Sequence, residues 1–135
     1  MFRYHHTAIS VSNIEKSIDF YSRMGFKEVL LWQSENKDLI IANLKLNDFY
    51  LELFCYTDFQ ASTVNSELNN DLKHIGVRHF ALQVDSVDKA KVFFEKNSIA
   101  SNIKVNLGRT GLKYFFITDP DKIFVEIVED NRMLE

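Results

Sequence analysis

The chain has 135 residues, of which 46% are hydrophobic and 26% charged, and its formal net charge is −3. This profile is typical of one soluble globular domain and excludes disordered, collagen-like and disulfide-framework chains, while the lack of a basic block makes nucleic acid an unexpected partner. Cys55 is the only cysteine, no signal peptide is evident and no apolar run reaches membrane-span length, so we expect a cytoplasmic protein without membrane association.

The first half of the sequence predicts a strand, a helix and three further strands. Apolar and polar residues alternate over 4–11, which is typical of a half-buried strand. The helix that follows is expected to begin at a capping box formed by Ser12 and Glu15 and to end at Gly25. Three strands are then expected over 27–32, 38–44 and 49–55, with a hairpin turn at 46–48.

The second half repeats this pattern. Residues 79–94 align on residues 6–21 without a gap, which indicates an internal duplication. A strand over 78–84 and a helix capped by Asp85 or Ser86 and stopped at Asn97 are expected, followed by strands over 103–106, 113–118 and 123–128 and a turn at 119–121. The single domain, 1–135, therefore contains module one (about 2–57), a linker (about 58–75) with a short helix around 64–72, and module two (about 76–130).

Strand alternation places one histidine and one glutamate of each module on the sheet face that points away from the helix. His6 and Glu52 are 46 residues apart in module one, and His79 and Glu126 are 47 residues apart in module two. A carboxylate among apolar neighbours is costly unless it is paired or binds a metal. Two imidazoles and two carboxylates suit one divalent cation, with zinc, nickel, cobalt, manganese and iron all left open. The alternative is that these histidines are structural and these glutamates are solvated.

Other residues carry weaker predictions. Tyr50, Phe54 and Phe124 share the glutamate faces and would line a substrate pocket. Arg109, in a turn flanked by glycines, either anchors an acidic substrate or satisfies backbone carbonyls. Arg78 is expected to form a salt bridge.

The residues also resemble a known family. The similarity lies in the opening His6-Thr-Ala-Ile-Ser-Val, the helix Glu-Lys-Ser-Ile-Asp-Phe-Tyr21 and the ending Phe116-Ile-Thr-Asp-Pro-Asp-Lys-Ile-Phe-Val-Glu126. These segments resemble hallmarks of the vicinal oxygen chelate superfamily of glyoxalases, bleomycin resistance proteins and extradiol dioxygenases. The resemblance implies an α+β fold in which two βαβββ modules form a curled mixed-sheet cup around a metal, and its ligand positions fall on the same four residues: His6, Glu52, His79 and Glu126.

This ligand set is most similar to that of glyoxalase I. The resemblance implies a metal-dependent lyase or isomerase for a small oxygen-chelating substrate, with Glu126 as the first candidate base, Glu52 as its symmetry mate, and a homodimer as the assembly. Ser10 and Tyr56 stand where bacterial glyoxalase I holds glutathione with Arg and Asn, which argues against glutathione. The alternatives are a non-catalytic drug-binding or small-molecule-binding protein of the bleomycin-resistance type and an extradiol-type dioxygenase.

Overall fold

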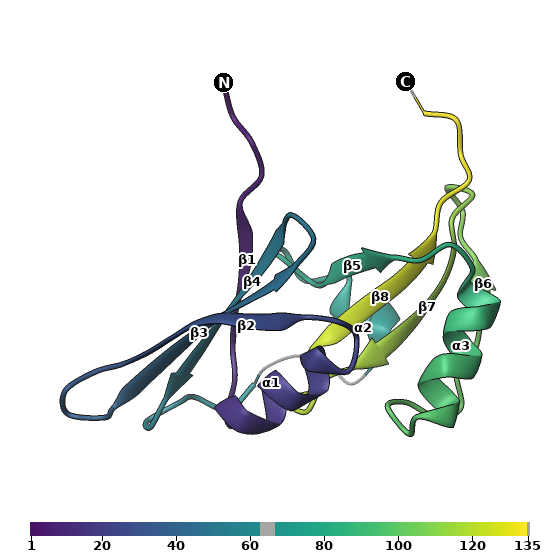
Figure 1. Ribbon diagram of the computed structural model, residues 1–135. Coiled ribbons are helices and arrows are strands. Elements are labelled where there is room, and N and C mark those ends of the chain that lie inside the picture. Colours follow the sequence, from purple (N-terminus) through teal and green to yellow (C-terminus); the bar gives the residue numbers. More distant parts are fainter. Residues whose placement is uncertain (63–66, 135) are drawn as a thin grey trace. The chain divides into compact units, whose positions relative to one another are not determined.

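The chain folds into two α+β units, each built on an open four-stranded mixed sheet (Figure 1). The computed structural model describes residues 1–62 and 67–134. Its two compact units are Met1–Thr63 and Val64–Glu135, which we call module one and module two from here on. The predicted α+β class and the duplicated strand-helix-strand-strand-strand order are confirmed. No helix in the described ranges combines the length and hydropathy needed to cross a membrane.

Module one contains the five elements that the sequence predicts. Its sheet has the strand order β1-β4-β3-β2, in which β1 runs parallel to β4 and the remaining pairs are antiparallel. A parallel β1–β4 pair requires a crossover, and the helix and the β2–β3 hairpin provide it. The elements are β1 (His6–Ser10), α1 (Ile14–Ser22), β2 (Lys27–Gln33), β3 (Leu39–Leu46) and β4 (Phe49–Tyr56).

Module two repeats this topology with the strand order β5-β8-β7-β6. A short helix precedes its sheet, and residues 64–66 of the helix predicted around 64–72 lie outside the described residues. The elements are α2 (Leu68–Asp71), β5 (Phe80–Gln83), α3 (Val87–Lys96), β6 (Asn106–Leu107), β7 (Lys113–Thr118) and β8 (Phe124–Glu129).

β6 is shorter than the predicted strand over 103–106, and it begins at Asn106 instead of at residue 103. The Asn106 side chain donates to the carbonyl of Lys104, a local bond that offers the backbone an alternative to the sheet ladder. Pairing with β7 begins only at Asn106, and the ladder ends where Gly108 N–H donates to the Leu112 carbonyl in the hairpin.

Each sheet packs one face against its helix. In module one, Leu51 and Leu53 of β4 are fully buried, as is Tyr21 of α1. In module two, Val125 and Ile127 of β8 are buried on the corresponding face. Burying one such aliphatic side chain contributes about 1.5–3 kcal/mol to folding, so this alternation strongly fixes which residues point the other way.

The helix starts differ from the expected capping box in one case. Asn13, rather than Ser12, is the N-cap of α1, because its side-chain oxygen accepts a hydrogen bond from Lys16 N–H three residues on. In α3 the cap is Ser86, one of the two residues predicted, and it accepts from Lys89 N–H.

Both long helices end in the same hydrogen-bonded motif. At α1, Phe26 N–H bonds to the Tyr21 carbonyl and Gly25 has a φ of +99°. At α3, Ile99 N–H bonds to the Phe94 carbonyl, and Ser98 takes the left-handed position with a φ of +54°. This is a Schellman ending, in which the left-handed residue is best a glycine. The predicted role of Gly25 is therefore confirmed, and Asn97 is the C-cap of α3.

Replacing Ser98 with glycine is expected to stabilise the protein by about 0.5–1 kcal/mol, because glycine has no Cβ to oppose a positive φ. Urea denaturation followed by circular dichroism measures the change. Gly25→Ala is the matched control and should lower stability, because its new Cβ would lie 3.4 Å from Leu46 Cδ1 at a positive φ. A destabilised Ser98→Gly variant would contradict this explanation.

Candidate functional site

Module one brings His6 and Glu52 together on the sheet face opposite α1. In the parallel β1–β4 ladder Ala8 lies beside Glu52, so His6 is one pleat away on the same face. His6 Nε2 and Glu52 Oε1 are 3.8 Å apart, and the two side chains are 42% and 24% exposed. Asn43, directly opposite Glu52 on β3, donates from Nδ2 to Glu52 Oε2 at 3.3 Å. The carboxylate is therefore oriented by an amide on its own sheet.

His6 also has a neighbour on its other ring nitrogen. Its Nδ1 is 2.9 Å from Nδ1 of His5, within hydrogen-bond distance. The His5 ring lies parallel to Tyr50, with centroids 5.5 Å apart and an interplanar angle of 10°. The Lys45 ammonium is 5.4 Å from the Tyr50 ring centre. His5 is itself exposed, and its ring contacts the predicted site residue Tyr50.

Module two brings His79 and Glu126 together at the equivalent place. His79 Nε2 and Glu126 Oε2 are 3.2 Å apart, with side chains 24% and 15% exposed. Phe116, opposite Glu126 on β7, packs edge-on against the imidazole with centroids 4.9 Å apart. His79 Nδ1 is buried and has no hydrogen-bond partner. This pair is thus bordered by an aromatic ring where module one has the amide of Asn43.

Each pair has the chemistry of half a metal site. Two ligand atoms about 2.1 Å from one cation lie roughly 3.0–3.5 Å apart, and the His–Glu separations of 3.2 and 3.8 Å are close to this range. A neutral imidazole and a carboxylate are ligands that zinc and other transition metals accept. Within the described residues of either module, no three His, Cys, Asp or Glu side chains form a metal-binding group. One module alone therefore brings together two side chains that could bind a metal.

The predicted pocket residues have different surroundings. Phe124 is buried within module two, where it packs against Phe116 with ring centroids 6.1 Å apart. Tyr50 and Phe54 are half-buried in module one. Phe124 lines a pocket of about 310 Å³ in module two, whose other lining residues are Ile99, Ala100, Ser101, Phe116, Ile117 and Thr118.

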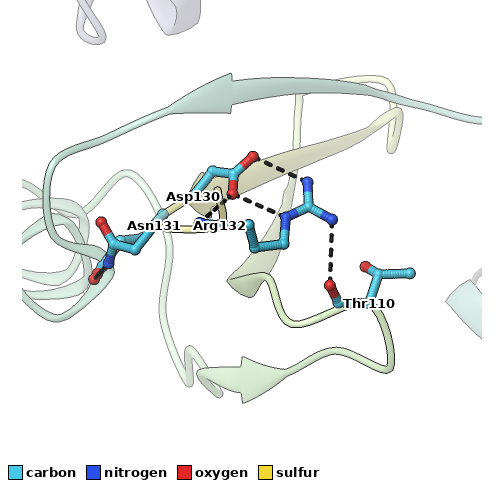
Figure 2. A network of polar contacts seen from close by, with 5 residues as sticks. Thr110, Asp130, Asn131 and Arg132 are labelled. Atoms are coloured by element: carbon cyan, nitrogen blue, oxygen red, sulfur yellow. Dashed lines mark hydrogen bonds and ion pairs between the residues drawn. The ribbon is translucent and has the colours of Figure 1, made fainter. Parts of the chain in front are cut away.

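Arg109 is exposed at the tip of the hairpin between β6 and β7. The C-terminal segment contacts this hairpin through Arg132, which donates from Nη1 to the carbonyl of Thr110 (Figure 2). Arg132 also donates from Nε and Nη2 to the carboxylate of Asp130, each at 2.9 Å. These bonds lower the pKa of Asp130 to about 2, so the pair stays charged at neutral pH and loses its interaction only as the pH falls toward 2.

Arg78 forms the salt bridge that the sequence predicts. Its Nη1 is 3.4 Å from Oδ1 of Asp71, whose side chain is 2% exposed. The guanidinium therefore compensates a buried carboxylate of α2.

Strand alternation was a signal that could have identified two further residues around the pairs. Asn43 and Phe116 stand at equivalent positions of the third strand in each module, each directly opposite the glutamate. Alternation in the first and last strands of each module identifies only the His–Glu pairs and their flanking residues. Alternation in the third strands places Asn43 and Phe116 on the same face as the His–Glu pairs.

Comparison with known proteins agrees with this architecture. A sequence model of the Glyoxalase/Bleomycin resistance protein/Dioxygenase superfamily matches residues 3–127. YwkD of Bacillus subtilis (strain 168) is 32% identical over 127 residues, which cover 93% of this chain and 94% of YwkD.

Solved structures give the same result. A glyoxalase family protein from Enterococcus faecalis is 28% identical, with a TM-score of 0.77 over 94% of this chain and 97% of that one. The trypanothione-dependent glyoxalase I of Leishmania major, at 21% identity, shares the fold with a TM-score of 0.69 over 96% of this chain and 87% of its own. The family match extends over nearly the whole chain, and the protein therefore belongs to the Glyoxalase/Bleomycin resistance protein/Dioxygenase superfamily.

Proposed function

We propose that this protein is a divalent-metal-dependent lyase or isomerase for a small substrate that binds the metal through two oxygen atoms. The observation that carries the proposal is the duplication of a His–Glu pair, with nitrogen–oxygen distances of 3.8 and 3.2 Å, at equivalent places in the two modules. In each module the carboxylate lies on a sheet face where an unpaired charge is costly, and binding a cation would offset that cost. The proposed ligands are His6, Glu52, His79 and Glu126.

Zinc, nickel, cobalt, manganese and iron all fit these ligands. When bound, such a cation lowers the pKa of the substrate's carbon acid and neutralises the negative charge that develops on its oxygens. The protein must then supply a base that moves a proton between neighbouring carbons.

Glu126 is the proposed base. It would remove the proton from one substrate carbon and return it to the adjacent carbon, so that no oxidant or reductant is consumed. The surroundings favour Glu126 over Glu52 as the base. Asn43 donates a hydrogen bond to the carboxylate of Glu52, whereas the ring of Phe116 lies opposite Glu126. Glu52 is then the more firmly held ligand.

A drug-binding or small-molecule-binding protein of the bleomycin-resistance type is the second candidate. The aromatic side chains that border both pairs, which include Tyr50 in module one and Phe116 in module two, favour a flat ligand. An extradiol-type dioxygenase is the third class and would require iron and consume oxygen. Ligand affinity that is unchanged after metal removal would select the binding protein, and oxygen uptake with iron would select the dioxygenase.

Native mass spectrometry of the protein, stripped of metal and then reloaded with zinc or nickel, tests the proposal. We expect one tightly held ion per chain, because the two modules of a chain supply four ligands whether they serve one site or two sites shared in a homodimer. Metal should also increase the proportion of homodimer if modules from two chains build each site.

The His74→Ala variant is the control for ions that bind surface imidazoles, since His74 is exposed and bonds through Nδ1 to the Asn70 carbonyl. It should retain the full metal content. A wild-type protein that takes up no ion from a micromolar excess of zinc or nickel would refute the enzymatic proposal.

A further inference from the structure

Two adjacent histidines lie at the start of β1, and the proposed ligand set uses only the second. The rings of His5 and His6 are perpendicular, with centroids 5.1 Å apart, and their Nδ1 atoms are 2.9 Å apart. On its other side the His5 ring stacks on Tyr50 at an interplanar angle of 10°. The stacking holds the imidazole of His5 in the orientation that meets Nδ1 of His6.

The chemistry of a histidine ligand indicates which of the two rings donates this hydrogen bond. A neutral imidazole has one N–H, so a ring that binds a cation through one nitrogen carries its proton on the other. In His6 the nitrogen beside Glu52 is Nε2, which leaves Nδ1 to carry the proton toward His5. Histidine ligands usually donate this second N–H to an acceptor that fixes the ring and strengthens its basicity.

We propose that His5 is a positioning residue for the metal ligand His6. In the metal-bound protein His6 Nδ1–H donates to Nδ1 of His5, which fixes the tautomer of His6 and aims its Nε2 at the cation. This inference rests on the proposed metal-binding function and adds to it a residue outside the four ligands.

Module two has a different residue at the position equivalent to His5. Arg78 stands where module one has His5, and its guanidinium pairs with Asp71 instead. His79 Nδ1 is buried without a hydrogen-bond partner, and the ring is held by its packing against Phe116. The two histidines are therefore supported in different ways, so loss of the His5 acceptor should affect the ligand of module one alone.

The test is the His5→Phe variant, which keeps a flat ring for stacking on Tyr50 and removes the accepting nitrogen. We expect its Zn²⁺ affinity, measured by competition with a chromogenic chelator, to fall about tenfold. In NMR spectra of the zinc-loaded wild type, the Nδ1 proton of His6 should exchange slowly with water. That signal should disappear in the variant, because an exposed N–H without an acceptor exchanges fast. His5→Gln, which retains a carbonyl acceptor, should recover most of the affinity.

His74→Phe is the matched control, since it replaces an exposed imidazole that belongs to neither His–Glu pair and bonds through Nδ1 to the Asn70 carbonyl. It should leave both the affinity and the His6 signal unchanged. If His5→Phe binds zinc as tightly as the wild type and keeps the His6 signal, the positioning role is refuted while the metal site stands. If the wild type binds neither zinc nor nickel, the proposed function itself fails, and this inference fails with it.

Discussion

Glu126→Gln is expected to weaken Zn²⁺ or Ni²⁺ binding at least about 100-fold, because loss of a direct ligand should cost no less than the 10–100-fold typical of a residue that only supports a ligand. The amide also cannot serve as a base, so turnover of any substrate found by screening should fall roughly 10²–10⁴-fold. Competition with a chromogenic chelator measures the affinity, and initial rates at saturating metal separate lost catalysis from lost metal.

Glu95→Gln is the control for the change in charge, because Glu95 is exposed on α3. Its affinity and rate should match those of the wild type. Glu52→Gln should weaken the metal comparably but retain more turnover at saturating metal, since Glu126 remains to move the proton. If Glu126→Gln binds metal with wild-type affinity, Glu126 is not a ligand, and the proposed set loses one member.

Arg78→Met is expected to lower the free energy of unfolding by about 2–3 kcal/mol. The substitution leaves the carboxylate of Asp71, 2% exposed, without its compensating charge, and breaking a buried pair from one side costs about 3–5 kcal/mol. We place the effect below that range because Arg78 itself is 28% exposed and water partly screens the pair. Urea denaturation provides the measurement.

Lys113→Met provides the comparison, because Lys113 pairs with Asp88 at the surface, where both side chains are well exposed. That variant should show little change in the unfolding midpoint. The double variant with Arg78→Met and Asp71→Asn should recover part of the lost stability, since the buried charge is removed as well. Equal midpoints for Arg78→Met and Lys113→Met would show that the buried pair contributes no more than a surface one.

Much of each module could be predicted from the sequence because its signals are local. Period-two alternation identified the strands, and the gapless match of residues 6–21 to 79–94 identified the duplication. The same alternation put His6 and Glu52 on one face, and in the structure His6 Nε2 lies 3.8 Å from Glu52 Oε1. The local pattern did not identify the N-cap of α1, because two neighbouring residues are both suited to that position. Ser12 and Asn13 are both good N-cap residues, and the hydrogen bond to Lys16 N–H decides for Asn13.

The sequence by itself thus determined the class of the fold, the repeat and the face that carries each His–Glu pair. Only the tertiary structure decided which residues stand opposite each glutamate, because Asn43 and Phe116 are brought there by the pairing of their strands rather than by sequence proximity. The physical reason is that alternation specifies the face of a residue, whereas strand order and register specify its neighbours on that face.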